Sequence, residues 1–567
     1  MEVHDSRRLT GPNIVTDGPA AILDLVVGPG DDVEAAVAAW RRNAERMLAA
    51  VGWDGARLHH RVFHGGLSLA FRAPIDALYA ATEVNEWAWD AAVTELAGGS
   101  EDDRAAGFDE AVARLRREIE NEVNPGVLAL QAAARSHDVA FLWDDDHVSV
   151  GLGSGSHTWS AGHVPSPADI DWSRVHDVPV AQITGTNGKT TTVRLLAAMA
   201  RAADMVAGVS STDWIAAGED VLDHGDYSGP GGARQVLRDR RVDCAVLETA
   251  RGGMLRRGLA LERTDVALVT NVAEDHLGEF GVHDLDALAE CKFVVARAAA
   301  HLVLNADDPV VRRHGAESAT PVTWYSLDAG DPFVAEHVEG GGDACLLERG
   351  RLVHVTGGRR LAMAEVADVP ITLGGAARHN VANALAAIGV AARLGLSHRA
   401  IGDGLRRFRS TPESNPGRLN EFEIDGARFI VDFAHNPHGV DALLEMAAAL
   451  PARRRLITLG QAGDRDDDAI RALARSTWAA RPDRILIKSM LEYLRGRDEG
   501  EIPAILEAEL REAGAGDEHF SHTGSELETA AAAVEWAEPG DLILLIIHTD
   551  RGSVVDFLRA AAVSTQE

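Results

Sequence analysis

An apolar run is joined to a helical run by Ile183-Thr184-Gly185-Thr186-Asn187-Gly188-Lys189-Thr190-Thr191. Gly185 and Gly188 allow backbone amides to approach phosphate oxygens, and the start of the helix adds partial positive charge. Lys189 is expected to reach the terminal phosphates of a nucleotide, and Thr190 to place its hydroxyl on Mg²⁺. The pattern is incomplete, because Ile183 stands where the general phosphate loop has glycine. This order of strand, loop and helix predicts a nucleotide-binding α/β domain.

Apolar segments continue to alternate with helical ones along the rest of the chain. They lie at residues 178–184, 244–249, 265–271, 301–307, 428–434, 455–460, 484–489 and 542–547. Short continuous apolar strands between helices are typical of a mostly parallel sheet that helices cover on both faces. The fold class predicted for this part of the chain is therefore α/β.

The length of 567 residues corresponds to roughly three or four domains. Gly, Ser, Pro and His gather between residues 151 and 171, a composition that favours turns and a domain boundary. We predict an N-terminal α+β domain over residues 1–165, a central, mostly parallel P-loop domain over 166–410 and a C-terminal Rossmann-like α/β domain over 411–567. In the first domain, apolar spacing predicts helices near residues 32–51, 74–97 and 109–134.

The composition excludes several classes of protein. Hydrophobic residues make up 46% and charged residues 25% of the chain, the proportions of a globular protein. No apolar run approaches the roughly 20 residues of a membrane-spanning helix. The opening MEVHDSRRLT lacks the apolar core of a signal peptide, so we expect a cytoplasmic protein with no membrane partner. A formal net charge of −32 argues against nucleic acid as a partner.

Lysine is scarce in this chain. It occurs only at Lys189, Lys292 and Lys488, so 52 of the 55 basic residues are arginine. Because a primary amine can do chemistry that a guanidinium cannot, the three retained lysines are candidate functional residues. The three cysteines are scattered, and we expect them to be small buried hydrophobic side chains.

Seven motifs follow the loop in a fixed order. They are residues 247–259 (LETARGGMLRRGL), 271–278 (NVAEDHLG), 305–309 (NADDP), 378–385 (RHNVANAL), 416–419 (PGRL), 431–437 (VDFAHNP) and 494–497 (LRGR). Together with GTNGKTT they resemble the Mur ligase superfamily, over about residues 178 to 550. The first and last of them resemble its cyanophycin synthetase branch in particular.

The resemblance implies an ATP-dependent amide ligase. Such an enzyme uses ATP to turn a carboxylate into an acyl phosphate, releases ADP, and lets an amine displace the phosphate. Its catalysis is largely positioning plus electrostatic stabilisation of the transferring phosphoryl group. The cofactors implied are ATP and Mg²⁺, with a second divalent ion as an open alternative. The nucleotide-binding residues implied are Gly185, Thr186, Asn187, Gly188, Lys189, Thr190, Thr191, Asn305, Asn380, Arg418 and Asp432.

The catalytic residues implied are Lys189, Glu248, His276 and Lys292. Glu248 ends an apolar strand and supplies a hard oxygen ligand for Mg²⁺, beside Thr190. The resemblance implies that His276 binds a second divalent ion, and that Lys292 is carbamylated by CO₂ and so becomes an anion that also holds this ion. Arginine cannot form this adduct, yet a plain cation at Lys292 stays an open alternative.

Substrate binding is assigned to five basic residues. Arg251, Arg256 and Arg257 form a basic cluster in an acidic protein, which either neutralises an acidic substrate or pairs with nearby acids. His435 belongs to a family motif but could equally serve to cap the next helix. Lys488 ends a strand whose terminus should face a cleft, where it either meets a substrate carboxylate or is solvated.

The N-terminal segment shares motifs with the cyanophycin synthetase branch. Residues 8–13 (RLTGPN) and 148–153 (VSVGLG) resemble two of its segments. In that branch an ATP-grasp module follows the second segment, but here the strand of the phosphate loop follows within about 25 residues, so no such module fits. A zinc-binding H-x-x-E-H motif of some relatives aligns with residues 83–87 (EVNEW), which lack both histidines, so we predict no hydrolase activity.

The leading hypothesis is a ligase that joins an amino acid to the carboxylate of a small acidic or peptide-like substrate. The first pair that the resemblance implies is arginine with an aspartate or glutamate side chain. Two alternatives stay open: an amidating ligase that uses ammonia, and a non-catalytic scaffold derived from cyanophycin synthetase. Intact Lys189, Thr190, Glu248, His276 and Lys292 argue against the scaffold. Whether the chain forms a homo-oligomer is left open.

Overall fold

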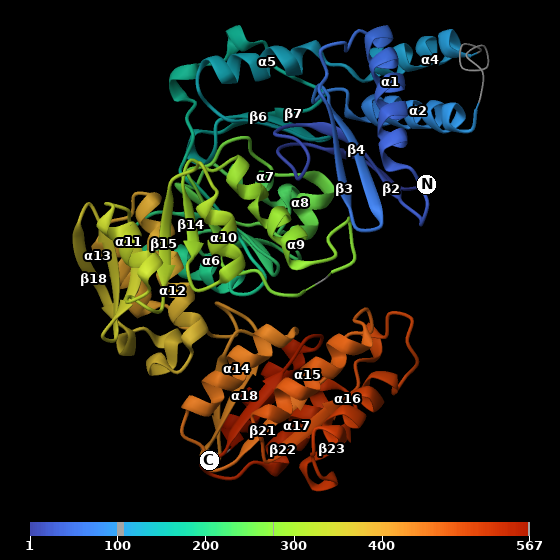
Figure 1. Cartoon of the computed structure of the whole chain (residues 1–567). Helices are drawn as coiled ribbons and strands as arrows, with labels where there is room; N and C mark the ends of the chain where they lie inside the picture. Colours follow the sequence, from blue (N-terminus) through green and yellow to red (C-terminus); the bar gives the residue numbers. More distant parts are fainter. Residues whose placement is uncertain (99–106, 276, 565–567) are drawn as a thin grey trace.

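The described residues of the computed structural model form four sheets, two in the N-terminal part and one in each of the two parts that follow (Figure 1). The structure describes residues 1–98, 107–275 and 277–564. The sheet of the N-terminal part lies beside the large central sheet, and the C-terminal sheet lies at the other end of the molecule. None of the described helices combines the length and the apolar composition that crossing a membrane requires.

The N-terminal part is α+β. Its main sheet is antiparallel in the order β1-β2-β4-β3, formed by β1 (Glu2–Leu9), β2 (Ala20–Val26), β3 (Leu58–Phe63) and β4 (Gly66–Arg72). Its helices are α1 (Val33–Val51), α2 (Leu78–Leu96), α4 (Phe108–Glu122) and α5 (Pro125–Ser136). A second sheet is formed by β5 (Phe141–Trp143), β6 (His147–Val150) and β7 (His157–Ser160).

The helix predicted over residues 109–134 is in fact two helices. The first ends at Glu122 and the second begins at Pro125. Proline has no N–H to donate and disfavours a helical residue before it, so it is tolerated at the start of a helix and not inside one. Asn124 completes the break, because its side chain accepts hydrogen bonds from the N–H groups of Gly126 and Val127.

The central sheet has parallel strands in its middle and antiparallel pairs at both edges, in the order β11-β10-β9-β12-β8-β13-β14-β15-β16-β17-β18. The strands are β8 (Val180–Thr184), β9 (Ala207–Ser210), β10 (Trp214–Ala217), β11 (Asp220–His224), β12 (Cys244–Glu248), β13 (Val266–Val269), β14 (Leu302–Asn305), β15 (Val322–Ser326), β16 (Ala344–Glu348), β17 (Arg351–Thr356) and β18 (Arg359–Glu365). The strands from β9 to β16 run parallel.

Helices cover the central sheet on both faces. They are α6 (Lys189–Ala202), α7 (Pro230–Leu237), α8 (Arg251–Arg257), α9 (Leu285–Lys292), α10 (Pro309–Ala316), α11 (Pro332–Glu339), α12 (Arg378–Arg393) and α13 (His398–Arg407). Leu268 packs toward α6 and α12, whereas its neighbour Val269 packs toward α8 and α9. Because successive side chains alternate between the faces of a strand, a strand buried on both faces must be apolar throughout, as the sequence predicts.

The C-terminal sheet is parallel apart from one edge strand, in the order β19-β20-β24-β21-β22-β23. Its strands are β19 (Asn420–Ile424), β20 (Ala427–Asp432), β21 (Arg455–Leu459), β22 (Arg484–Lys488), β23 (Phe520–Thr523) and β24 (Leu542–Ile546). Its helices are α14 (Pro437–Ala449), α15 (Asp467–Ala479), α16 (Glu501–Glu512), α17 (Glu526–Trp536) and α18 (Arg551–Ser564). The predicted α/β fold class is therefore confirmed.

Lys488 lies inside the C-terminal domain and not at a substrate. Its side chain is 0% exposed and forms an ion pair with Glu526, whose side chain is 1% exposed. Its ammonium also donates to the carbonyl oxygen of Ile546 at 2.5 Å and lies 3.3 Å from Nδ1 of His548. The expectation that Lys488 meets a substrate carboxylate is therefore corrected: Glu526, the first residue of α17, supplies the carboxylate inside the domain.

Glu526 in turn holds the turn that precedes α18. Its carboxylate accepts hydrogen bonds from the N–H groups of His548, Thr549 and Asp550 at 2.7, 2.8 and 2.8 Å. Burial alone would raise the pKa of this carboxyl, but the charge of Lys488 and these hydrogen bonds outweigh it and lower the pKa to about 2. The ion pair therefore fixes the start of α18.

We expect Lys488→Met to destabilise the C-terminal domain by about 3–5 kcal/mol, because it leaves the Glu526 carboxylate buried and unpaired. The matched variant is Lys488→Met with Glu526→Gln, which removes the charge but keeps an acceptor for the N–H groups, and it should recover part of this loss. Hydrogen exchange of the β22 amides measures both effects. Equal exchange in wild-type and Lys488→Met protein would contradict the prediction.

The pKa of Glu526 also predicts an acid limit. Its folded value, about 2, lies below the ordinary value of 4.5, so its contribution is complete above pH 4.5 and is lost as the pH falls toward 2. Amide exchange of residues 548–550, corrected for the intrinsic effect of pH, should therefore increase within this window. In the Glu526→Gln variant, the corrected amide exchange of these residues should not change between pH 4.5 and pH 2.

Candidate active site

A cleft of about 1320 Å³ opens between the central and C-terminal domains. The phosphate loop, the end of β12 and α8 line it from the central domain, and the segments after β20 and β24 line it from the C-terminal domain. The carboxyl ends of parallel strands meet at one edge of a sheet, which is where ligands bind in open α/β folds. The cleft lies at this edge of the central sheet, because the loops that follow β8, β12, β13 and β14 all contribute to it.

The phosphate loop has no room for side chains at its two glycines. Gly185 has φ +140° and Gly188 has φ +87°, both in the region that favours glycine. A Cβ at Gly185 would lie 1.8 Å from Oγ1 of Thr270, and one at Gly188 would lie 2.3 Å from Oδ1 of Asn383. Nζ of Lys189 donates to the carbonyl oxygen of Thr186 at 2.9 Å, which holds the ammonium at the mouth of the loop.

Neighbouring side chains brace the same loop. Oγ1 of Thr186 donates to the carbonyl oxygen of Ala273 at 3.1 Å, and the N–H of Asn187 donates to Oδ1 of Asn271 at 2.9 Å. Thr191, in the first turn of α6, is buried and accepts from the amide of Asn415 at 3.4 Å. The loop is therefore preorganised by contacts with the ends of β13 and with the segment that leads to β19.

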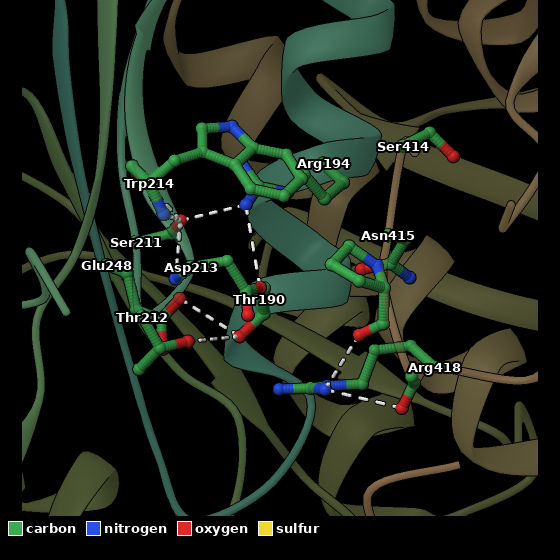
Figure 2. A network of polar contacts seen from close by, with 12 residues as sticks. Thr190, Arg194, Ser211, Thr212, Asp213, Trp214, Glu248, Ser414, Asn415 and Arg418 are labelled. Carbon is green, nitrogen blue, oxygen red and sulfur yellow. Dashed lines mark hydrogen bonds and ion pairs between the residues drawn. The ribbon is translucent and has the colours of Figure 1, made fainter. Parts of the chain in front are cut away.

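Thr190 and Glu248 meet at the floor of the cleft (Figure 2). Oγ1 of Thr190 donates to Oε2 of Glu248 at 3.0 Å and lies 3.3 Å from Oγ1 of Thr212. Glu248 is 2% exposed, and its Oε1 is buried without a hydrogen-bond partner among the residues that the structure describes. Burial raises the pKa of this carboxyl. The charge of Lys189 and the hydrogen bond from Thr190 lower it, but the effect of burial is larger. A buried carboxylate oxygen that lacks a donor, beside a hydroxyl, fits a hard divalent cation such as Mg²⁺.

A second acidic group near this point was missed by the sequence analysis. Asp213 follows β9 and lies close to the buried guanidinium of Arg194, with 3.7 Å between Oδ2 and Nη2 (Figure 2). Arg194 stacks on the ring of Trp214 at 3.6 Å and donates to Oγ of Ser211 at 2.8 Å. Burial lowers the pKa of Arg194 to about 10, so the group stays charged at neutral pH. The signal in the sequence is the polar run Ser211-Thr212-Asp213 directly after a buried strand.

Lys292 lies at the end of α9 and also lines the cleft. It is 4% exposed, and burial lowers the pKa of its amine to about 7, together with the nearby charge of Lys189. A neutral amine is therefore available near neutral pH. His276, the other predicted ligand of a second ion, lies outside the residues that the structure describes.

The structure separates the three arginines of the basic cluster. Arg251 and Arg256 line the cleft, whereas Arg257 does not. The side chain of Arg251 is 10% exposed and donates from Nη2 to Glu279 at 2.7 Å, while its Nη1 is buried with no hydrogen-bond partner in the described part of the chain. Arg257 is exposed and follows Arg256 at the last turn of α8, where the helix has rotated away from the cleft. The assignment of Arg257 to substrate binding is therefore corrected.

The four predicted nucleotide-binding residues outside the phosphate loop, Arg418, Asp432, Asn305 and Asn380, all line the cleft, and each already makes at least one polar contact. Arg418 donates to the carbonyl oxygen of Pro416 at 3.1 Å and stacks on Phe433 at 4.7 Å. The carboxylate of Asp432 accepts from the N–H groups of Leu419 and Ala434 at 3.0 and 2.9 Å. Each carboxylate oxygen keeps a further lone pair for a hydroxyl group.

The two asparagines predicted beside them hold loops together. The amide of Asn305 donates to the carbonyl oxygen of Thr270 at 2.9 Å, and that of Asn380 donates to the carbonyl oxygen of Ile371 at 2.9 Å. Oδ1 of Asn380 accepts from Asn383 at 3.0 Å. These two side chains shape the wall of the cleft.

Polar contacts join the two domains across the cleft. Nη1 of Arg551, at the start of α18, forms an ion pair with Oδ1 of Asp213 at 3.0 Å. The amide of Asn187 in the phosphate loop contacts Oδ1 of Asn436 at 3.1 Å and Nδ1 of His438 at 2.9 Å. The C-terminal domain therefore rests directly on the loop and on the acidic group beside it.

A second contact between the domains involves a predicted residue. Nε2 of His435 lies 3.6 Å from Oδ2 of Asp275, and Arg465 donates to Oδ1 of Asp275 at 2.9 Å. His435 lines the cleft, and the cap of α14 is supplied by the next residue, Asn436, whose Oδ1 accepts from the N–H of Gly439 at 2.8 Å.

Three residues that join the domains, Asp275, Arg465 and Arg551, were not predicted. Sequence alone carries little signal for them, because their partners lie in another domain.

Two domain models match the chain. The Mur ligase middle domain matches residues 183–391, and the Mur ligase, glutamate ligase domain matches residues 417–546. The first contains the phosphate loop, Glu248 and Lys292, and the second contains Asp432 and the segment that faces them across the cleft.

Curated relatives fall in two groups. Cyanophycin synthetase of Crocosphaera subtropica is 40% identical over 328 residues, which are 57% of this chain and 37% of that protein. This chain thus spans just over a third of the length of that relative. A UDP-N-acetylmuramoyl-L-alanyl-D-glutamate–2,6-diaminopimelate ligase of Geobacter metallireducens is 29% identical over 394 residues, which are 65% of this chain and 73% of that protein.

Among solved structures, the E. coli FolC complex with ADP shares 19% identity and covers 69% of this chain and 90% of its own, with a TM-score of 0.49. The domain models, the order of the motifs and the parallel sheets agree with one another. From residue 183 to residue 546 this chain consists of the middle and C-terminal domains of the Mur ligases, and it belongs to that family.

Proposed function

We propose that this protein is an ATP-dependent, ADP-forming amide ligase that activates a carboxylate as an acyl phosphate and transfers it to an amine. The observation that supports it best is the convergence of Lys189, Thr190 and Glu248 with Lys292 and Arg251 in one cleft. Phosphate-binding, cation-binding and carboxylate-binding groups are the three sets that this reaction needs. The Mur ligases and cyanophycin synthetases named above are ligases, which supports the same class of reaction.

Thr190 and Glu248 would hold Mg²⁺, through the hydroxyl and the unpartnered Oε1. When bound, Mg²⁺ neutralises negative charge on the phosphate oxygens of the nucleotide. Asp213 lies at the next strand end and is held by Arg194 and Arg551. The protein thus keeps two carboxylates in place beside the phosphate loop, at the point where a cation is needed.

Lys189 and the amides of the phosphate loop would bind the terminal phosphates. The ammonium of Lys189 now donates to the carbonyl oxygen of Thr186, so a phosphate oxygen would share or replace that acceptor. The helix α6 begins at this residue and directs its N-terminal end at the same point. Arg418 and Asp432 would contact the nucleotide from the C-terminal domain.

Arg251 would bind the carboxylate of the acid substrate. One edge of its guanidinium is held by Glu279, and the unpartnered Nη1 remains for a ligand. A guanidinium matches a carboxylate in geometry and charge, so this group suits a small acidic or peptide-like substrate. Arginine as the amine, joined to an aspartate or glutamate side chain, is the pair that we propose to test first.

Lys292 would carry a carbamate. Its amine has a pKa of about 7, so a large fraction is neutral at neutral pH, and the neutral amine is the form that adds CO₂. The nitrogen forms a bond to the carbon of CO₂ and releases one proton, which leaves a carboxylate on the side chain. This anion would complete a second cation site with His276.

The reaction class is tested by incubating the protein with ATP, Mg²⁺ and pools of amino acids and acidic dipeptides. We expect ADP, phosphate and a new mass equal to acid plus amine minus water. Formation of AMP, or no ADP above background with any pool, would argue against the proposed reaction.

Lys189→Arg should lower kcat by about 10²–10³-fold, because a guanidinium cannot occupy the position of the ammonium. Arg201→Lys is the matched control, since Arg201 lies on the same helix in an exposed pair with Glu219.

The carbamate is tested with two variants of Lys292. Lys292→Arg keeps the charge and should abolish turnover. Lys292→Ala should also be inactive and should regain activity with a short carboxylic acid such as acetate, which replaces the missing anion. Rescue by methylamine but not by acetate would instead show that Lys292 acts as a cation. Activity measured in wild-type protein stripped of CO₂ should fall and return with bicarbonate.

Closure of the cleft is tested at Arg551. Arg551→Met removes the ion pair with Asp213 and should raise the Kd for ATP by about tenfold, the cost of one charged hydrogen bond. Arg559→Met is the matched control, because Arg559 lies on the same helix and pairs with Glu413 outside the cleft. Equal affinities of the two variants, measured by titration calorimetry, would contradict a role of Arg551 in nucleotide binding.

A further inference from the structure

Helix α8 brings Arg251 and Arg256 to the cleft, and it is only seven residues long. The last carbonyl groups of a helix have no partner within it, so a short helix depends on donors from elsewhere. Within α8, the N–H of Gly258 donates to the carbonyl oxygen of Met254 at 2.9 Å. Two further carbonyl groups at this end, those of Leu255 and Arg257, receive donors from the N-terminal domain.

Arg7 supplies the first donor. Its Nε donates to the carbonyl oxygen of Leu255 at 3.0 Å, and its Nη1 donates to Oδ2 of Asp24 at 2.6 Å. The side chain of Arg7 is 7% exposed and that of Asp24 is 6% exposed, so the pair is buried between the domains. A cation at the C-terminal end of a helix is also favoured by the helix dipole.

Thr10 supplies the second donor, and the chain then pairs with the segment after the helix. The N–H of Thr10 donates to the carbonyl oxygen of Arg257 at 2.7 Å, and the N–H of Leu259 donates to the carbonyl oxygen of Pro12 at 2.8 Å. The backbones meet with no space between them, because a Cβ at Gly11 would lie 2.2 Å from the carbonyl oxygen of Leu259. This close approach explains the glycine of the RLTGPN motif.

The same domain also holds the loop that supplies Glu279. Arg61 forms an ion pair with Glu290 of α9 at 3.1 Å, and a Cβ at Gly281 would lie 2.6 Å from the ring of Phe63. The guanidinium of Arg7 lies 4.8 Å from the ring of Phe280, next to the residue that binds Arg251. Both partners of the ion pair between Arg251 and Glu279 therefore lie on elements that the N-terminal domain supports.

We propose that residues 7–13 form the C-terminal cap of α8 and that Arg7 is a positioning residue, which aligns Arg251 and Arg256 for the carboxylate of the acid substrate. The assignment of a substrate to these arginines rests on the proposed function. The N-terminal domain thus acts on the part of the cleft that α8 lines, whereas the contacts described above for the phosphate loop come from the central and C-terminal domains.

Two variants test the cap. Arg7→Lys keeps a charge beside Asp24 but cannot reach both Asp24 and the carbonyl oxygen of Leu255. Gly11→Ala changes no charge and adds one methyl group at the contact with Leu259. The matched controls are Arg8→Lys, since Arg8 stacks on Tyr79 and pairs with Asp145 within its own domain, and Gly28→Ala, where a Cβ would meet only ordinary contacts.

In both test variants we expect amide exchange over residues 251–259 to rise at least tenfold, with exchange of α6 unchanged. Trypsin should cleave after Arg251 and Arg256 at least tenfold faster. In the ligase assay the KM for the acid should rise about tenfold while the KM for ATP stays within twofold of the wild-type value. The controls should match the wild-type protein in all three measurements.

The proposal is overturned if exchange over residues 251–259 in Arg7→Lys and Gly11→Ala equals that of the controls. It is also overturned if the KM for ATP rises together with that for the acid, since that pattern means a general defect. A wild-type protein that turned over no acid would refute the proposed function, and amide exchange and trypsin cleavage would still decide whether residues 7–13 hold α8.

Discussion

The hydrogen bond between Thr190 and Glu248 is the contact on which the arrangement of the cleft depends. It joins the start of α6 to the end of β12, at the edge where parallel strands end side by side. The carboxylate is buried and keeps one oxygen without a hydrogen-bond donor among the described residues. Because a buried carboxylate is costly without a partner, this oxygen favours a cation at the centre of the cleft.

Charges around this centre are held in ion pairs, one of which crosses between domains. Asp213 is bound by Arg551 of the C-terminal domain, and Arg251 is bound by Glu279 on a loop that the N-terminal domain supports. A protein with a net charge of −32 can still present a basic surface to an acid, because its arginines are gathered locally and most of their neighbours along α8 are uncharged. The central and C-terminal domains thus line the cleft, and the N-terminal domain contacts elements that line it.

The three lysines of this chain lie in two different kinds of environment. Lys189 and Lys292 line the cleft, where the proposed reaction would use a compact ammonium and a free amine. Lys488 lies inside the C-terminal sheet, where its ammonium contacts Glu526 and the carbonyl oxygen of Ile546. A guanidinium is larger and planar, and a Cβ added at Gly460 would already lie 2.6 Å from Cγ of Lys488, so the side chain is closely packed there.

The sequence by itself determined the α/β class, the phosphate loop and the residues at strand ends, because buried parallel strands must be apolar and a loop that approaches phosphate must contain glycine. Glu248 could be chosen from its motif, and Lys292 from the scarcity of lysine together with the family resemblance. Only the tertiary structure decided that Lys488 is internal, that Arg257 leaves the cleft, that Arg7 contacts the end of α8 and that Arg551 reaches the cleft from the C-terminal domain. Such contacts depend on how separate domains pack, and no local pattern of residues records that packing.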